Sequence, residues 1–507
     1  MSPEDNVPLL IQQLYSPDLF KRAAGVWQQK LTAHLERVLN RDAAVLNWQA
    51  PQDAIEQATA ILQQGCQTNT LPGVPAESAE HLLQRFGALV DQILASGQNL
   101  HHPHYIGHQV PAPVPLAGLF DSTGTVTNQV MAVFEMGPWA TAVEFSLLER
   151  LAAKIGWPAG QSAGVLTHGG SLANLTALLT ARNVSFPGCW EQGIPRNAVL
   201  IAHEDAHYSV ARAAGVLGLG SQQVIRVGVD SQRRMCPVRL NEALMEQTNA
   251  GRQVLAVSAC ACATPTGAFD PIPEIADVCQ RHQVWLHVDA AHGGSVLLSR
   301  KHRHLVAGLE RADSVVWDAH KMMFVPALCA AVLYRNKAHR LEAFRQTAPY
   351  LFDPSAPGMA EFDSGMGTLE CTKRATGFGL WGLWSMLGDE VFEQMVDWTF
   401  ELGQILHTML KDADDFEPLH QPQCNIVAFR YLPDSIRHAG IETQNRFQYE
   451  LRTRIIRSGS FYIVQTRLDD VVALRVTVMN PTTTKADLQE LLDELRRQGQ
   501  QIYTSEN

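Results

Sequence analysis

Two short apolar runs in the middle of the chain end in side chains that can do chemistry. Val-Trp-Leu-His-Val-Asp (284–289) places the carboxylate of Asp289 at the end of one strand-length run, and Ser-Val-Val-Trp-Asp-Ala-His-Lys (314–321) places the amine of Lys321 after another. Buried strands of an open α/β sheet deliver such residues to the edge where ligands bind. An amine that forms a Schiff base and an acid that keeps a pyridinium nitrogen protonated are the groups on which pyridoxal phosphate chemistry relies. Taken singly, Asp289 could equally cap a turn and Lys321 could be a solvated lysine.

Glycines at the start of a predicted helix are suited to holding a phosphate. Gly170 and Ser171 follow an apolar run and precede a helix expected over 172–182. Backbone N–H groups at a helix N-terminus attract an anion, and glycine lets the backbone approach it closely. Thr264, after another predicted strand, and His320, beside the lysine, could add further donors. An ordinary tight turn would also explain the glycines.

Histidines that could act on a ligand occur at two places. His207 stands at a junction between strand and helix, where its ring could cover a cofactor and relay protons, although a helix cap is the alternative. Residues 101–109 hold four histidines, and we expect an active-site loop there in which His108 or Gln109 faces the substrate. A metal-dependent enzyme built between His101 and His108 stays an alternative, but no cysteine or acidic residue stands nearby to complete a metal site.

Strand and helix patterns alternate from residue 164 to about residue 336. This alternation predicts an α/β fold in which helices cover both faces of a mainly parallel sheet. A further helix is expected over 338–345.

The two ends of the chain have a different character. The first 95 or so residues carry helical patterns that proline interrupts at Pro51, Pro72 and Pro75. The last 130 or so favour two or three strands with flanking helices, which is a small α+β domain. We therefore expect an N-terminal helical segment (1–97), a large cofactor-binding domain (98–375) and a small C-terminal domain (376–507).

The composition predicts a soluble protein of more than one domain. The 507 residues exceed what a single core holds, and 46% are hydrophobic. A net charge of −11 argues against nucleic acid or an anionic membrane as a partner, and no apolar run has the length of a bilayer span. The N-terminus has no pattern of a secretory signal, and the odd count of nine cysteines fits reduced thiols. We therefore expect a cytoplasmic protein that acts on a small molecule.

Four motifs occur in the order in which a known family carries them: Gly-Gly-Ser-Leu-Ala-Asn (169–174), His-Tyr-Ser (207–209), His-Val-Asp-Ala-Ala (287–291) and Asp-Ala-His-Lys (318–321). Through them the chain, from about residue 98 onward, resembles the group II pyridoxal phosphate-dependent amino acid decarboxylases. These include glutamate, cysteine sulfinate, aromatic amino acid and diaminobutyrate decarboxylases. The resemblance implies fold type I, the aspartate aminotransferase-like architecture with a mostly parallel seven-stranded sheet. It also implies a homodimer with active sites at the subunit interface.

The resemblance also implies roles for individual residues. Lys321 is expected to form the Schiff base, Asp289 to pair with the pyridinium nitrogen and His207 to stack on the ring. Further positions match the phosphate site and the small residue under the ring: Gly170, Ser171, Thr264, His320 and Ala291. Arg475 matches the arginine that binds the substrate carboxylate, a task suited to a bidentate guanidinium.

A loop after the lysine resembles the glutamate and cysteine sulfinate members most. Ala-Pro-Tyr-Leu-Phe (348–352) matches their mobile loop, whose tyrosine returns a proton to Cα, so Tyr350 favours clean decarboxylation. The chain departs from the family at Cys262 and at His168, where small residues are more usual. Residues 130–134, where relatives select their substrate, offer no obvious polar partner for a substrate side chain.

These motifs predict α-decarboxylation of a small, acidic L-amino acid to its amine and carbon dioxide. Aspartate, cysteine sulfinate and glutamate are the expected substrates. L-2,4-Diaminobutyrate comes next, followed by aromatic amino acids. From other classes, a metal-dependent enzyme and a catalytically silent dimer kept for binding are the alternatives.

Overall fold

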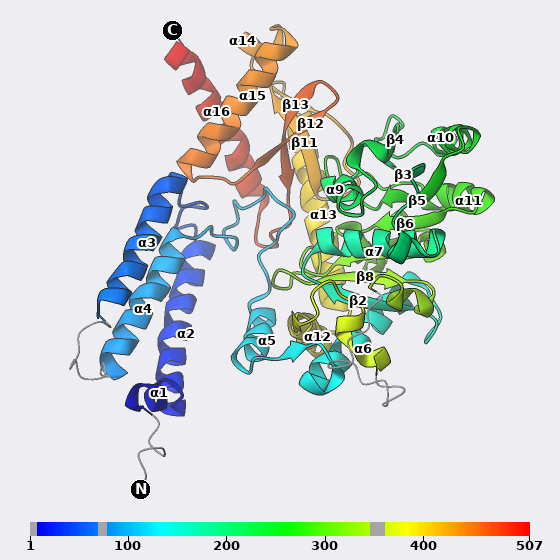
Figure 1. The fold of residues 1–507 in the computed structure, drawn as a ribbon. Coiled ribbons are helices and arrows are strands. Elements are labelled where there is room, and N and C mark those ends of the chain that lie inside the picture. The colour runs from blue at the N-terminus through cyan, green and yellow to red at the C-terminus, as the bar shows by residue number, and fades with distance from the viewer. Residues whose placement is uncertain (1–7, 69–78, 345–359, 507) are drawn as a thin grey trace. The chain divides into compact units, whose positions relative to one another are not determined.

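The computed structural model describes residues 8–68, 79–344 and 360–506. The chain divides into two compact units, each described below by itself with the labels of Figure 1. The first unit comprises Met1–Ile106, Tyr449–Ile463 and Thr482–Asn507, and the second comprises Gly107–Gln448 and Val464–Pro481. The division into three successive domains expected from the sequence stays a prediction.

A seven-stranded sheet forms the centre of the second unit, in the order β2-β8-β7-β6-β5-β3-β4. The pairs from β7 to β4 are all parallel, whereas β8 is antiparallel to both of its neighbours. The mostly parallel seven-stranded sheet implied by the resemblance is therefore confirmed. Its strands are β2 (Ala163–Thr167), β3 (Ala198–His203), β4 (Val224–Val227), β5 (Gln253–Cys260), β6 (Trp285–Asp289), β7 (Ser314–Asp318) and β8 (Ala330–Tyr334).

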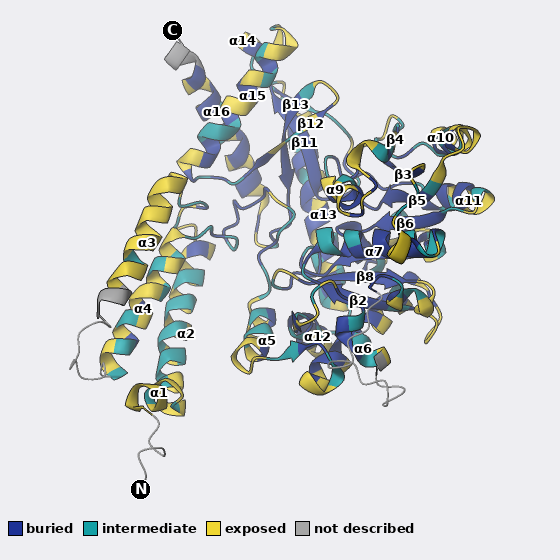
Figure 2. Cartoon of the chain, viewed as in Figure 1, coloured by how far each residue is buried: buried dark blue, intermediate teal, exposed yellow. Residues whose placement is uncertain are grey.

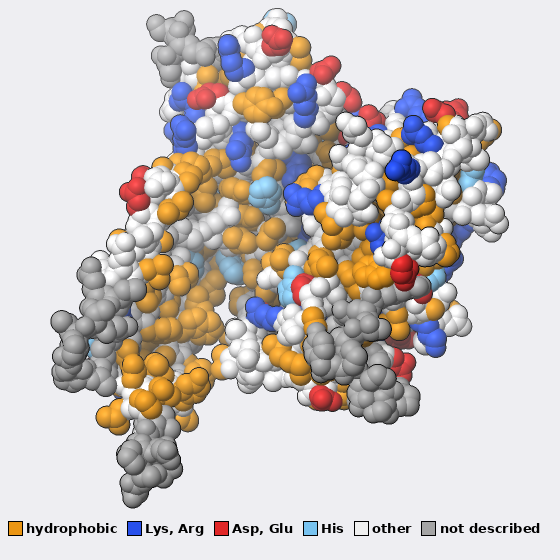
Figure 3. Space-filling model, in the orientation of Figure 1, with side chains coloured by type: hydrophobic (Ala, Val, Ile, Leu, Met, Phe, Trp, Pro, Cys, Tyr) orange, Lys and Arg blue, Asp and Glu red, His pale blue; other side chains and the backbone are white. Residues whose placement is uncertain are grey.

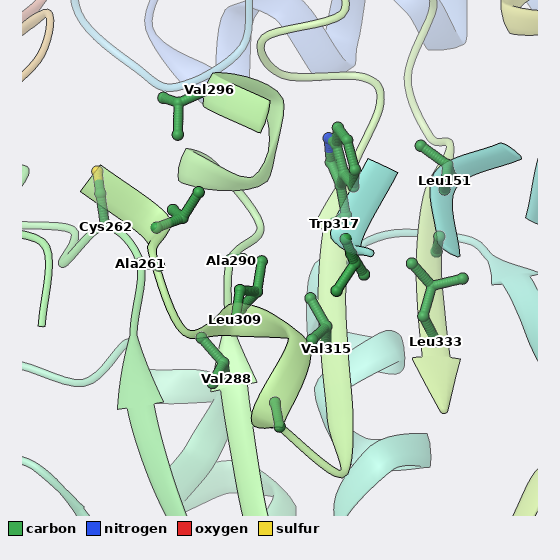
Figure 4. Packing of buried hydrophobic residues seen from close by; sticks show 14 of the residues in the cluster. Leu151, Ala261, Cys262, Val288, Ala290, Val296, Leu309, Val315, Trp317 and Leu333 are labelled. Atoms are coloured by element: carbon green, nitrogen blue, oxygen red, sulfur yellow. The ribbon is translucent and has the colours of Figure 1, made fainter. Parts of the chain in front are cut away.

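Helices cover both faces of this sheet. Successive side chains of a strand point to opposite faces, so each strand contributes to two apolar cores, one under each layer of helices. Val315 and Trp317 of β7 belong to one core, shown in Figure 4, while Val316 between them belongs to the other. Strands β3, β6, β7 and β8 are buried along their whole length, whereas the edge strand β4 has an exposed residue, Arg226 (Figure 2). Helices α6, α10 and α11 supply the first core, and α7 and α9 supply the second. Their bounds are α6 (Pro138–Ile155), α7 (Gly170–Ser185), α9 (Tyr208–Val216), α10 (Pro237–Asn249) and α11 (Ile272–His282).

Short elements complete the large sheet's surroundings. The helix expected over 338–345 is wrong in type and length, because a 3-10 helix, η7, forms there and is capped by the side chain of Asn336. The short elements are α5 (Pro115–Val126), β1 (Val130–Met131), η2 (Phe134–Met136), α8 (Cys189–Gln192), η3 (Ser221–Gln223), η4 (Gly293–Leu298), η5 (Arg303–Val306), η6 (Leu309–Arg311), η7 (Lys337–Leu341), η8 (Ala360–Phe362), η9 (Ser364–Met366) and β9 (Lys373–Arg374). Strands β1 and β9 pair antiparallel.

A second, antiparallel sheet has the order β10-β11-β13-β12. The two strands that the sequence predicted most clearly are β11 and β13, but the expected total of two or three is wrong because β10 and β12 flank them. The elements of this region are α12 (Phe378–Leu387), α13 (Glu390–Lys411), β10 (Phe416–Pro418), β11 (Ile426–Tyr431), α14 (Asp434–Arg437), α15 (Ile441–Ser458), β12 (Val464–Leu468) and β13 (Val471–Thr477). Helix α13 packs on β10 and β11.

The first unit is helical, as expected, with α2 packed against α4. Its helices are α1 (Leu9–Leu14), α2 (Pro17–Leu39), α3 (Pro51–Thr68), α4 (Ala79–Ser96) and α16 (Lys485–Glu506), together with the part of α15 that begins at Tyr449. Pro51 does not interrupt a helix but begins one, at the position where the missing N–H costs nothing. Within the described ranges, no helix combines the length and the apolar character that crossing a membrane requires.

The described thiols differ in exposure. Cys371 is exposed and Cys236 is half-buried, while the rest are buried: Cys189, Cys260, Cys262, Cys279, Cys329 and Cys424. All are free thiols, as the sequence predicted for this part of the chain.

Candidate active site

A cavity of about 350 Å³ opens beside the carboxyl ends of the parallel strands. It brings together most of the predicted site residues: Gln109, Gly170, Ser171, His207, Thr264, Ala291, Asp289, His320 and Lys321. Gly169, from the glycine turn expected at the phosphate, lines it too. Other residues of its wall were not predicted to act there: His168, Asn174, Cys260, Cys262, His292, Asp318 and Leu328. Tyr350 lies outside the described residues. The structure thus places the predicted groups side by side, while their individual roles stay predictions.

Adjacent parallel strands bring the amine and the carboxylates to one edge of the sheet. Asp289 ends β6 and Asp318 ends β7, and Lys321 follows in the turn after β7. Lys321 Nζ lies 3.3 Å from Asp318 Oδ2, so its nearest carboxylate is Asp318. Asp289 is held by other groups, since its Oδ2 accepts from Asn174 Nδ2 (2.8 Å) and its Oδ1 from the backbone N–H of Ala291 (3.1 Å).

The N-terminus of α7 forms the glycine-lined end of the cavity. Gly169 has a φ of +106°, a conformation that side chains rarely adopt, and Gly170 begins the helix. A Cβ on Gly170 would stand 2.6 Å from Asp318 Oδ2, so only glycine fits there without moving the carboxylate. The free N–H groups of this helix end, with Ser171 beside them, suit a phosphate.

His320 and Thr264 also line this cavity. His320 Nδ1 lies 2.9 Å from the Cys329 carbonyl oxygen and 3.3 Å from the Cys329 backbone nitrogen, and its Nε2 lies 3.7 Å from Asp318 Oδ2. Thr264 follows β5, and its carbonyl oxygen accepts from Arg475.

His207 caps α9 with its own ring. Nδ1 accepts from the Ser209 backbone N–H (3.3 Å) and lies 2.8 Å from Ser209 Oγ. Burial lowers the pKa of His207 below its usual value. The ring is therefore mainly neutral at pH 7.

Arg475, on β13, is buried but does not line the cavity. Its Nη1 donates to the carbonyl oxygen of Thr264 (2.8 Å), a residue of the cavity wall, and its Nε has no hydrogen-bond partner. Burial lowers its pKa to about 10, so the guanidinium stays charged at neutral pH. Within the described residues no carboxylate pairs with it, which leaves a buried cation behind the cavity wall without a counter-ion.

The histidine-rich segment does not form one cluster. His108 is exposed and does not line the cavity, whereas Gln109 next to it does. His104 belongs to the first unit, where its ring contacts Asp487 Oδ1 (3.1 Å) and the Ser460 carbonyl oxygen (3.0 Å). In the part of the chain that the structure describes, no three histidine, cysteine or acidic residues are grouped as metal ligands would be.

Two residues of the cavity, Asn174 and Asp318, belong to motifs noted in the sequence, but no role is predicted for them there. Asn174 closes the glycine motif, and Asp318 opens the lysine motif. Position in a motif could have suggested both, but only the fold shows that Asn174 reaches Asp289 and that Asp318 faces Lys321. His168, another residue of the cavity wall, is held in place by Glu370, whose Oε1 lies 2.9 Å from His168 Nδ1.

These residues fit pyridoxal phosphate. The amine of Lys321 is available for a covalent bond, the small side chain of Ala291 leaves room for a ring, and the end of α7 leaves room for a phosphate. Asp289 keeps lone pairs for the ring nitrogen beyond the two hydrogen bonds it accepts.

Comparison with known proteins agrees with this chemistry. A family model described as "Pyridoxal-dependent decarboxylase conserved domain" matches residues 66–432. The crystal structure of mouse CSAD superimposes with a TM-score of 0.83 at 29% identity, covering 95% of this chain and 98% of that one. Oryza sativa TDC with PLP and tryptamine gives a TM-score of 0.83 at 20% identity, covering 96% and 99%.

A third structure is the glutamate decarboxylase domain of diaminobutyrate-pyruvate transaminase and L-2,4-diaminobutyrate decarboxylase from Vibrio parahaemolyticus. It gives a TM-score of 0.78 at 22% identity, covering 95% of this chain and 96% of that one. Together with Oryza sativa TDC it supports the fold. The predicted architecture, cofactor and reaction class are thereby confirmed: the chain belongs to the pyridoxal-dependent decarboxylase family and is a pyridoxal phosphate-dependent amino acid decarboxylase.

Proposed function

We propose that this enzyme removes the α-carboxylate of a short acidic L-amino acid, with aspartate, cysteine sulfinate and glutamate as candidates. The observation that carries the proposal is Arg475, a buried guanidinium without a carboxylate partner among the described residues. A buried cation of this kind is costly unless an anion joins it, and a guanidinium holds a carboxylate through two parallel hydrogen bonds. Arg475 lies against the cavity wall, where its Nη1 donates to the carbonyl oxygen of Thr264, and its Nε has no hydrogen-bond partner and is left for an anion.

The size of the cavity and the sequence resemblance support a short substrate. A volume of about 350 Å³ is at the low end for ligand sites, and it must also hold the cofactor. The loop around Tyr350 resembles that of the glutamate and cysteine sulfinate members. The 29% identity with mouse CSAD extends over nearly the whole chain.

The reaction breaks the bond between Cα and the carboxylate and adds one proton at Cα, so that an amine and carbon dioxide leave. Pyridoxal phosphate, when bound, supplies the electron sink for the pair left at Cα. Lys321 would hold the cofactor through Nζ, and Asp289 would hold a proton at its ring nitrogen. Arg475 would orient the substrate by binding a carboxylate, His207 would cover the cofactor ring, and Tyr350 would deliver the proton to Cα.

A panel of L-amino acids, with amine and carbon dioxide measured together, tests the substrate. We expect equal amounts of both products from at least one of aspartate, cysteine sulfinate and glutamate. L-2,4-Diaminobutyrate and aromatic amino acids belong in the same panel. Turnover of these alone would contradict the proposal while leaving the enzyme class intact.

We also infer that the enzyme works as a homodimer in the cytoplasm. The helices of the first unit carry apolar side chains that are exposed on the single chain, among them Phe20, Leu62, Leu89 and Ile93. Figure 3 shows this apolar surface over α2, α3 and α4. A second copy would cover such a surface. Sedimentation should give twice the 55.9 kDa of one chain, and a monomer at micromolar concentration would contradict the inference.

A further inference from the structure

One buried side-chain amide is linked by hydrogen bonds to two residues that are predicted to contact the cofactor, directly to Asp289 and through Ser209 to His207. Asn174 on α7 uses both hydrogens of Nδ2, one toward Asp289 Oδ2 (2.8 Å) and one toward Ser209 Oγ (3.0 Å). Ser209 Oγ in turn lies 2.8 Å from His207 Nδ1. We propose that Asn174 is a positioning residue that fixes both the orientation of the Asp289 carboxylate and the location of the ring proton of His207.

The orientation of the Asn174 amide follows from its neighbours on both sides. Its Oδ1 lies 2.9 Å from His287 Nε2. Because a carboxylate only accepts hydrogen bonds, the NH₂ group must face Asp289 and the oxygen must face His287. Burial lowers the pKa of His287 to about 4, so this ring is neutral at pH 7 and carries one proton. That proton is on Nε2, where it donates to Asn174.

The same chain continues behind His287. Its Nδ1 accepts from Ser314 Oγ (2.9 Å), and Ser314 Oγ accepts from Trp285 Nε1 (2.9 Å). An indole only donates and a carboxylate only accepts, so the chain has a fixed direction from Trp285 to Asp289. Every member is buried, which makes a reversed or broken bond costly. A flip of the Asn174 amide would oppose all of these bonds together.

The branch through Ser209 determines the tautomer of His207. Ser209 Oγ accepts from Asn174, and its own proton points to His207 Nδ1, because that nitrogen also accepts from the Ser209 backbone N–H and therefore carries no proton. The Ser209 backbone N–H approaches the same nitrogen at 3.3 Å. Nδ1 is therefore an acceptor and the ring proton is on Nε2. Without the donor from Asn174, the hydroxyl would be free to turn away.

The bond from Asn174 to Asp289 bears on how the protein would hold pyridoxal phosphate, the cofactor of the family. Asn174 and the Ala291 backbone N–H each take one oxygen of Asp289, which holds the carboxylate plane in one position for the ring nitrogen. The inference rests on that cofactor and does not depend on the substrate proposed above.

The substitution Asn174→Asp tests both halves, because it keeps the shape and replaces the NH₂ group with an oxygen, so that at most one proton, shared with Asp289, remains where two N–H donors stood. Histidine ¹⁵N spectra of the apoprotein should show the His207 ring protonated on Nε2 in the wild type, with the signal assigned from a His207→Gln sample. In Asn174→Asp the Ser209 hydroxyl should turn toward the new carboxylate, and the His207 proton should move toward Nδ1. Titration with pyridoxal phosphate should show an affinity lower by on the order of 10- to 100-fold.

Two further variants separate positioning from general packing. Thr180→Val, on the same helix, removes a buried hydroxyl that bonds to Tyr334 away from the cavity, and it should change neither readout. Ser209→Ala leaves only the longer backbone N–H bond at His207 Nδ1, so part of the ring population should move its proton to Nδ1. Cofactor affinity should fall less than in Asn174→Asp, since the bond to Asp289 stays intact.

The following outcomes would contradict the proposed role of Asn174. An unchanged His207 tautomer and unchanged cofactor affinity in Asn174→Asp would overturn the proposal, as would an equal loss in Thr180→Val. If Asn174→Asp does not fold, an unchanged tautomer in Ser209→Ala overturns it. The spectra of the apoprotein need no substrate, so a failed substrate panel beside the predicted shift would count only against the substrate.

Discussion

Lys321 Nζ lies 3.3 Å from Asp318 Oδ2, within one turn of the chain, and the other oxygen of Asp318 has no hydrogen-bond partner in the structure. The Asp318 side chain is 1% exposed, whereas that of Lys321 is 20% exposed. Lys321 therefore supplies most of the interaction that offsets the burial of the charged Asp318 carboxylate. In the absence of cofactor, the lysine that the chemistry needs is also a structural counter-ion.

This ion pair predicts an effect on stability. Lys321→Ala should lower the free energy of unfolding of the apoprotein by about 1–3 kcal/mol, because it leaves a buried carboxylate unpaired. Adding Asp318→Asn should restore most of the loss, since the neutral amide needs no cation. Urea denaturation of the two single variants and the double variant measures this coupling. Simply additive losses would show that the pair contributes nothing.

The cofactor attachment gives a second prediction. Lys321→Ala should lose turnover and the visible absorbance of the bound cofactor, because no other described lysine lines the cavity. Lys337→Ala changes an exposed lysine of η7 and should leave both unchanged. Retained turnover in Lys321→Ala would rule out this lysine as the attachment point.

Tyr350→Phe tests the proton donor. The variant keeps the ring but lacks the hydroxyl, so amine formation should fall by about 100-fold or more while cofactor affinity stays the same. Stopped-assay amine yields and a cofactor titration, done on one preparation, measure the two quantities. Undiminished amine output would show that another group donates the proton to Cα, and His207 would then be the next candidate.

Arg475→Lys tests the substrate carboxylate site. Lysine keeps the charge but loses the two-pronged geometry, so KM for the acidic substrate should rise by about tenfold or more. Arg467, exposed on the neighbouring strand β12, provides the matched control Arg467→Lys. Equal KM values for the two variants would remove Arg475 from the substrate site.

Buried neutral histidines predict a loss of stability in acid. The pKa of His287 is about 4 in the folded protein, against about 6.5 for an unfolded histidine. Below pH 6.5 the unfolded state therefore binds more protons, and folding weakens as the pH falls toward 4. At pH 5 this histidine should cost about 2 kcal/mol relative to pH 7.5. Urea denaturation at both pH values should show a smaller difference for His287→Gln, whereas the exposed control His304→Gln should behave like the wild type.

The centre of the fold could be predicted from the sequence because its signals are local. Asp289 and Lys321 each follow an apolar run of strand length, and in a parallel sheet such ends meet at one edge. The resemblance then supplied roles for the residues around them.

The errors arose where local signals are weak or where the contact is distant. Strand β10 has three residues and β12 alternates buried and exposed positions, so neither has a strong apolar run. The sequence does not distinguish a proline inside a helix from one at its start, so Pro51 predicts a break where the structure begins a helix. Exposure of His108 and the position of Arg475 behind Thr264 depend on how loops and sheets pack. For the same reason, Asn174 could be seen in a motif but its bond to Asp289 could not be foreseen.

Exposed Cys371 has a practical consequence. It directly follows Glu370, which holds His168 on the cavity wall, whereas the other described thiols are buried or half-buried. A bulky maleimide dye should therefore react with Cys371 before any of them. The label would stand one residue from a group that touches the active site, and its emission would report cofactor and substrate entering the protein in real time.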